Sequence, residues 1–366
     1  MKKIISGLLF LGAVLMNCST AGARPHEDWT RYVEPRIGTA HCRWFHFAPG
    51  AMPFGLAKPG PSTNGSLGNP SGWEATGYDY RENTIEGFPC LHEFQVGGIV
   101  LMPTKGRLVT VPGLPTDKEK KGYRSRFERK NEVATAGYYS VLLDDYDIKA
   151  EVTATPRVAF QRFTFPAGKD NHILFNIGNR QGESGAVKDA YVRYTADGRV
   201  EGWVITEPEY VKKYQPGATV PLYFSAVMDK KPAAYGSYNG EKQQQGAGES
   251  KGVGAGMYFT FAMDKTEPVT VKIGLSYTSV ENARANLAAE AEKMTFDKVR
   301  EQSHKTWNEY LGRIEVETSK NDDKVKFYTG LYHALLGRGL ASDVNGAYPR
   351  NDGTVGQIPL DAEGRP

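Results

Sequence analysis

The residues best suited to bind or act on a ligand are concentrated between Ile37 and Gly106. Glycine and proline recur there at a density that predicts loops in place of long helices or central strands. Loops that hold aromatic rings and a few polar groups are typical of a small-molecule site, and an irregular edge of the core is the alternative interpretation. The rings are Trp44, Phe45, Phe47, Trp73, Tyr78, Tyr80 and Phe88, and the polar groups are His41, His46, Asp79, His92 and Glu93.

The elements that must position this stretch follow it as short strands. Apolar and polar residues alternate over 106–111, 138–143, 148–153, 158–165, 172–177, 187–194, 199–206, 222–228, 257–263 and 269–275. Alternation predicts strands, and Asp197-Gly198 predicts a hairpin turn between two of them. So many short strands indicate a mainly β fold, a large two-sheet β-sandwich. Residues 236–256, rich in Gly, Gln and Lys, are expected to form a flexible loop.

The period of the apolar residues changes after Tyr277. Ser279 is expected to cap one helix and Thr295 a second, whose stripe comprises Phe296, Val299, Ser303, Trp307, Tyr310 and Ile314. Residues 314–318 are predicted as a short strand, and a further helix is expected to start at Asp322 or Asp323. The predicted organisation is a signal peptide (1–23), a β-sandwich (24–277), a helical linker (278–318) and the truncated start of a helical domain (319–366).

The first residues have the composition of an export signal. Lys2 and Lys3 precede an apolar run that is too short to span a bilayer. Cleavage after Ala23 would release the chain to the periplasm, whereas cleavage before Cys18, at an imperfect lipoprotein box, would leave a lipidated N-terminus on the cell envelope. Loss of the two lysines lowers the formal net charge from +3 to +1. A near-neutral chain argues against nucleic acid as a partner, and against a membrane except through lipidation.

Two cysteines, Cys42 and Cys90, remain after the export segment is removed. An oxidising compartment permits a bridge between them, so a Cys42–Cys90 disulfide is a hypothesis. Two free thiols are the alternative, because sequence spacing does not fix the geometry that a disulfide needs.

Several sequence blocks occur in a defined order. They are I-G-T at 37–39, P-G-A-M-P-F-G at 49–55, S-G-W and G-Y-D-Y within 71–80, I-E-G-F through P-T-K-G at 85–106, Y-T-G-L-Y-H-A-L-L at 328–336, S-D-V-N-G-A-Y at 342–348 and N-D-G at 351–353. In this order they resemble glycoside hydrolase family 92, the calcium-dependent exo-acting α-mannosidases of bacteria. The resemblance covers about residues 29–356 and implies a sandwich followed by the first helix of an (α/α)6 catalytic barrel.

The resemblance also implies the chemistry. Inverting hydrolysis needs a carboxylic acid on the leaving oxygen and a carboxylate that activates water. In the family both lie in the helical barrel, in a segment expected beyond residue 366. No catalytic residue is therefore assigned, the calcium site is expected in that same domain, and no turnover is expected from this chain alone.

The N-terminal domain would supply the rim that binds the sugar. Trp73 matches the family's aromatic loop and can stack on the C–H face of a pyranose. His92 matches the second His of the family's F-S-H-T-H-L-S-G run, which reads F-P-C-L-H-E-F-Q here. The substrate-binding candidates are Trp73, His92, Trp44 and Glu93, and a structural role in the core is the alternative for these side chains. For Asp343 and Asp352 we favour loop turns over a sugar or metal site.

These patterns predict an exported α-mannosidase-like hydrolase of glycan mannosides, with α-1,2 linkages as the expected substrate. A non-catalytic carbohydrate-binding protein is the alternative, and the aromatic loops support it equally well. Another glycosidase or phosphorylase built from a sandwich and a helical barrel shares the architecture but not the blocks. No sequence pattern indicates an oligomeric state.

Overall fold

The computed structural model describes residues 27–40, 47–63, 77–93, 96–117, 121–179, 185–337 and 339–366. The strands are β1 (Thr84–Ile85), β2 (Phe88–Glu93), β3 (Val96–Lys105), β4 (Ser125–Arg126), β5 (Val133–Thr135), β6 (Tyr138–Leu143), β7 (Ile148–Ala154), β8 (Val158–Phe165), β9 (Gly168–Asn176), β10 (Ala186–Tyr194), β11 (Val200–Glu207), β12 (Val220–Met228), β13 (Ala234–Asn239), β14 (Lys242–Gln245), β15 (Glu249–Lys251), β16 (Ala255–Met263), β17 (Glu267–Ser276), β18 (Ala347–Pro349) and β19 (Val355–Gln357). The helices are η1 (Trp29–Tyr32), η2 (Arg129–Asn131), α1 (Glu209–Tyr214), α2 (Val280–Ala291), α3 (Phe296–Leu311) and α4 (Asn321–Leu336).

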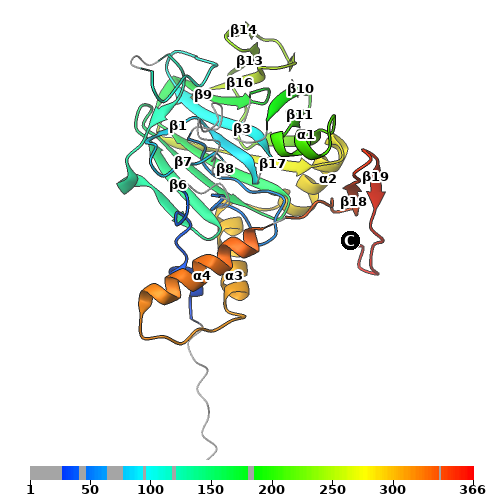
Figure 1. Cartoon of the computed structure of the whole chain (residues 1–366). Coiled ribbons are helices and arrows are strands. Elements are labelled where there is room, and N and C mark those ends of the chain that lie inside the picture. Colours follow the sequence, from blue (N-terminus) through cyan, green and yellow to red (C-terminus); the bar gives the residue numbers. More distant parts are fainter. Residues whose placement is uncertain are drawn as a thin grey trace, which may run out of the picture.

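Two large antiparallel sheets form the body of the molecule (Figure 1). One sheet has nine strands in the order β15-β10-β11-β12-β17-β8-β7-β6-β5, and the other has six in the order β14-β13-β16-β9-β3-β2. Aromatic pairs join the two sheets, because Phe88 of β2 meets Phe163 of β8 and Phe175 of β9 meets Phe224 of β12. The predicted two-sheet β-sandwich is therefore confirmed, with its main core between the sheets.

Helix α2 covers the outer face of the nine-stranded sheet. Along β8, Phe163 and Phe165 point into the main core, whereas Phe160 points the other way and packs with Leu287 and Ala291 of α2. Ser279 caps α2 by accepting a hydrogen bond from Asn282 N, as its sequence position predicts. The cap fixes where the chain turns from strand β17 into the helix.

Helices α3 and α4 pack with η1 at one end of the sandwich (Figure 1). Thr295 caps α3 as predicted. Trp307 of α3 is fully buried, and its indole N–H donates to the carbonyl oxygen of Ala51 at 2.8 Å. Ala48 and Ala51 pack against the same helices, so the 48–55 loop of the sandwich is the surface on which the helical part is seated.

Some predicted elements are wrong. Residues 106–111 are not a strand, because β3 ends at Lys105 and Gly106 takes a positive φ of 87°. Residues 314–318 are not a strand either, since Val316 N donates to the hydroxyl of Tyr328 and not to another strand. The expected loop over 236–256 contains β14, β15 and most of β13. Strands β14 and β15 are held by backbone pairing, and most of their side chains are polar and exposed. All other predicted strand ranges overlap a strand.

The stretch between Ile37 and Gly106 contains more strand than its proline content suggests. Strands β2 and β3 form a hairpin at the edge of the six-stranded sheet, and Pro103 lies within β3. Strand β2 pairs only with the part of β3 up to Leu101, so β3 has one open side at Pro103. A proline nitrogen that faces an open side leaves no ladder hydrogen bond unmade, and the strand tolerates it there.

Candidate functional site

The end of strand β2 holds the two site candidates that the structure describes. His92 is buried, with 4% of its surface exposed, and Glu93 is only partly buried. The His92 ring packs against glycines, because a Cβ added at Gly77 would lie 2.8 Å from Nε2 and one added at Gly60 would lie 3.3 Å from Nδ1. Gly77 has a φ of +86°, which favours glycine for the same residue. His92 is thus part of the packed edge of the sandwich, and its predicted contact with a sugar stays a prediction.

Lys58 lies against this strand end, and sequence reasoning did not single it out. Its backbone N–H donates to Cys90 O at 2.9 Å, and His92 N donates to Lys58 O at 3.1 Å. The Lys58 side chain is fully buried, and its ammonium forms an ion pair with Glu93 Oε1 at 2.5 Å. Burial lowers the pKa of Lys58, and Glu93 partly offsets that effect. A lone lysine between Ala57 and Pro59 in an otherwise apolar run is the signal that could have identified it.

The same pair reaches the helical part of the chain. Lys58 Nζ donates to Gly337 O at 2.7 Å, and Gly339 N donates to Glu93 Oε1 at 3.3 Å. The neighbouring loop adds two backbone bonds, from Phe54 N to Leu335 O and from Leu340 N to Phe54 O. Lys58 and Glu93 therefore lie where the sandwich meets the segment that follows α4.

The other sequence candidates have different outcomes. Trp44, Trp73, Cys42 and Cys18 lie outside the described residues, so their predicted roles stay predictions. Cys90 is a free, buried cysteine whose sulfur accepts a hydrogen bond from Gln161 Nε2 at 3.3 Å. Because Cys42 lies outside the described residues, the Cys42–Cys90 disulfide remains a hypothesis for chemical test.

Asp343 and Asp352 are in turns, as favoured from the sequence. Gly346 N donates to Asp343 O, and Thr354 N donates to the side chain of Asp352. The Asp343 carboxylate is buried and accepts hydrogen bonds from Ser276, Thr278 and Asn286. Both its oxygens accept hydrogen bonds from the chain, so this carboxylate fastens the segment after α4 to β17 and α2.

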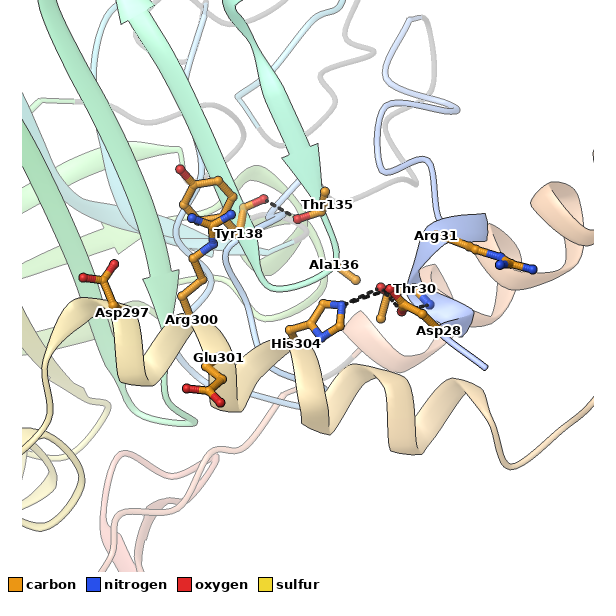
Figure 2. A pocket seen from close by; sticks show the side chains of 10 residues that line it. All are labelled: Asp28, Thr30, Arg31, Thr135, Ala136, Tyr138, Asp297, Arg300, Glu301 and His304. Carbon is orange, nitrogen blue, oxygen red and sulfur yellow. Dashed lines mark hydrogen bonds and ion pairs between the residues drawn. The ribbon is translucent and has the colours of Figure 1, made fainter. Parts of the chain in front are cut away.

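A cavity of about 580 Å³ lies between η1, the turn before β6 and helix α3 (Figure 2). Asp28 and Thr30 meet His304 at one end, and the Arg300 guanidinium lies 3.7 Å from the centre of the Tyr138 ring at the other. The side chains of Arg31 and Glu301 point away from the middle of the cavity in Figure 2. The lining of the cavity thus includes several charged side chains, and the Tyr138 ring is already covered by an arginine.

The Asp28, Thr30 and His304 side chains do not form a nucleophilic triad. Thr30 Oγ1 donates to Asp28 Oδ1 at 2.6 Å, and both residues face the same ring nitrogen of His304, Nε2. A triad needs the carboxylate on one ring nitrogen and the hydroxyl on the other. The cluster instead ties the N-terminal segment to α3.

In the part of the chain that the structure describes, no three or more His, Cys, Asp or Glu side chains come together as a metal site. Calcium therefore stays a prediction from the resemblance. Within these same segments, no helix is both long and apolar enough to cross a membrane.

A two-sheet sandwich with a helical segment seated on one end, and a polar cluster at their junction, defines a sandwich-plus-helix architecture. Residues 32–276 match the model of the glycosyl hydrolase family 92 N-terminal domain, and residues 282–362 match that of the family 92 catalytic domain. The chain therefore belongs to glycoside hydrolase family 92. The catalytic-domain match includes α3 and most of α2, which the sequence patterns alone assign to a linker.

Solved structures and a curated protein resemble the chain. A family 92 α-mannosidase from Bacteroides thetaiotaomicron, in complex with mannoimidazole, is 27% identical with a TM-score of 0.82, over 91% of this chain and 43% of that one. A family 92 glycosyl hydrolase is 26% identical with a TM-score of 0.76, over 90% and 44%. An uncharacterized secreted glycosidase of Arthroderma benhamiae is 26% identical over 361 residues, 90% of this chain and 44% of its own length. The chain spans less than half the length of these relatives.

Proposed function

We propose that this chain is the rim-forming part of an exported glycoside hydrolase that removes mannose from α-mannosides. The observation that carries the proposal is the ordered match to both family domains over residues 32–362. The similar structure from Bacteroides thetaiotaomicron is that of an α-mannosidase with mannoimidazole bound, which supports a mannoside as the ligand. The secreted relative from Arthroderma benhamiae supports export.

The finer parts of the proposal come from the family resemblance. We assign the substrate as an α-1,2-linked glycan mannoside and the reaction as inverting hydrolysis with two carboxylates. The chain binds the sugar through its rim residues and does not turn it over alone. The one carboxylate of the described segment after α4 that is buried, Asp343, accepts three side-chain hydrogen bonds, which supports a structural role for it.

The test is a mannose-release assay with purified residues 24–366 and α-1,2-mannobiose. We expect binding of the disaccharide and no release of mannose. Release that survives repurification and a buffer-only control would contradict the placement of the acid and base outside this chain. Absence of binding, with α-1,2-glucobiose as the matched control sugar, would contradict the role of the chain as a mannoside rim.

A carbohydrate-binding protein without catalysis is the second candidate. The observation that favours it is the polar pair Lys58–Glu93 at the junction between the sandwich and the helical part. Such a pair can bind a sugar, and binding requires no catalytic carboxylates. The two candidate functions can be distinguished by adding the separately purified helical domain of a relative to this chain. Mannose release by the mixture would indicate part of an enzyme, and binding without release would indicate a carbohydrate-binding protein.

A further inference from the structure

The Lys58–Glu93 ion pair lies at a site where burial makes an ion pair a weak source of stability. Lys58 has no exposed side-chain surface, whereas 20% of the Glu93 side chain is exposed. Removing two charges from water costs about as much as their attraction returns, so replacing a buried pair by apolar residues is often neutral or stabilising. The pair therefore calls for a role besides stability.

The contacts fix one oxygen of Glu93 and leave the other open. Oε1 accepts from Lys58 Nζ at 2.5 Å and from Gly339 N at 3.3 Å. No residue of the described segments donates to Oε2. A carboxylate held by one oxygen, with the second oxygen unoccupied on a partly exposed side chain, is an acceptor already oriented for a hydroxyl group.

The backbone keeps this acceptor in place. Lys58 pairs through its main chain with Cys90 and His92, so the lysine and the end of β2 move as one unit. Its ammonium then joins Glu93 to Gly337 O across the junction with the helical part. A Cβ at Gly339 would lie 2.2 Å from Gly55 O, so the two segments are too close for any other side chain there.

We propose that Lys58 is a positioning residue that holds Glu93 as a hydrogen-bond acceptor for a sugar hydroxyl at the junction of β2 and the segment after α4. The inference rests on the proposed function, because it assigns a specificity role within that same rim. A charged acceptor fixed in advance favours ligands with a hydroxyl at that position over deoxy sugars. The ligand class is a neutral polyhydroxylated sugar, since the carboxylate repels an anion.

The test uses residues 24–366 and four variants: K58M, E93L, K58M/E93L and E93Q. K58M/E93L replaces the ion pair by apolar side chains, and E93Q keeps an oxygen for Lys58 while replacing Oε2 by an NH₂ donor. Binding of α-1,2-mannobiose is measured by calorimetry, and the melting temperature is measured on the same samples. The control is R284M/E201L, which removes a partly buried ion pair between α2 and β11 on the outer face of the nine-stranded sheet.

We expect K58M/E93L to melt near the wild-type temperature and E93Q to melt lower, because E93Q leaves the buried Lys58 without its carboxylate. Both variants should fold and should bind the disaccharide at least about tenfold more weakly, because a hydrogen bond to a charged group is lost. The control variant should bind like the wild type. Wild-type affinity in either E93Q or a folded K58M/E93L would overturn the role of the pair and leave the proposed function intact. Failure of the wild-type chain to bind would overturn both.

Discussion

At the scale of single residues, the junction between the sandwich and the helices depends on side chains at the end of β2 and on Lys58, which packs against them. Glu93 follows His92 at the end of β2, and Lys58 neutralises it from within the packed loop. Cys90, two residues before His92, points into the core and contacts Gln161. The strand end is thus built from a buried thiol, a buried ring and a fixed carboxylate.

Cys90 should be chemically inert in the folded chain. Burial raises the pKa of its thiol, so the reactive thiolate is scarce and also inaccessible. A maleimide added to native protein should leave the peptide containing Cys90 unmodified, whereas the same reagent in guanidinium should label it fully. The measurement is peptide mass spectrometry after a non-reducing digest. A peptide in which Cys42 and Cys90 are disulfide-linked would contradict the free thiol.

At the scale of elements, the segment after α4 is fastened to α2 by one carboxylate. Asp343 accepts from Ser276, Thr278 and Asn286, and Val344 N donates to Asn286 Oδ1. Arg157 adds a bond from its Nε to Ser342 O. The β18–β19 hairpin lies beside α2 in Figure 1 because this cluster holds the chain that leads to it.

Replacement of Asp343 by alanine should therefore destabilise the chain by about 2–3 kcal/mol, since two buried donors, Ser276 and Asn286, and the partly buried Thr278 lose their acceptor. Urea unfolding followed by circular dichroism measures the loss. Asp352→Ala is the matched control, because Asp352 is an exposed aspartate in the next turn, and we expect no measurable change. Equal midpoints for the two variants would show that the cluster does not hold the segment.

At the scale of the whole molecule, buried tyrosines set the alkaline limit of stability. Burial raises the pKa of Tyr123, Tyr139, Tyr238 and Tyr332 above the ordinary value of 10.0. A tyrosine whose pKa is raised in the folded state does not change the free energy of unfolding with pH below pH 10. Above pH 10 the free energy of unfolding falls, because the tyrosine ionises in the unfolded chain before it ionises in the folded one.

The free energy of unfolding should thus fall above pH 10 by about 1.4 kcal/mol per pH unit for each such tyrosine. Tyrosinate absorbance and far-UV circular dichroism, recorded in one titration, measure this coupling. The part of the absorbance change that belongs to the buried tyrosines should occur over the same pH range as the loss of the far-UV circular dichroism signal of the β-sheets. Complete tyrosine ionisation in a chain that keeps its circular dichroism would contradict the burial of these rings.

Much of the fold could be predicted from the sequence, because strand alternation and capping are local signals. Ser279 and Thr295 begin helices where their positions predict, and Asp197-Gly198 joins β10 to β11. The strands β14 and β15 were missed because their side chains are polar and exposed, so only backbone pairing defines them. Proline at 103 hid β3, since no local pattern shows that β2 stops pairing at Leu101 and leaves β3 one open side at Pro103.

The site was less predictable, because it depends on long-range contacts. Aromatic loops and the family blocks drew attention to His92 and Glu93, and both lie at the junction with the helical part. Lys58 was missed, since its only local signal is its place in an apolar run, and its partners are 35 and 279 residues away. A buried lysine is identified only by the groups that surround it.

The most direct test of the account is hydrogen–deuterium exchange of residues 24–366 with saturating α-1,2-mannobiose, against α-1,2-glucobiose. If the chain forms a mannoside rim at the junction, the mannobiose should slow exchange in residues 56–63, 77–93 and 339–343 and leave the cavity beside α3 unchanged. Protection confined to residues 297–304, equal protection by both sugars, or no protection at all would contradict the account.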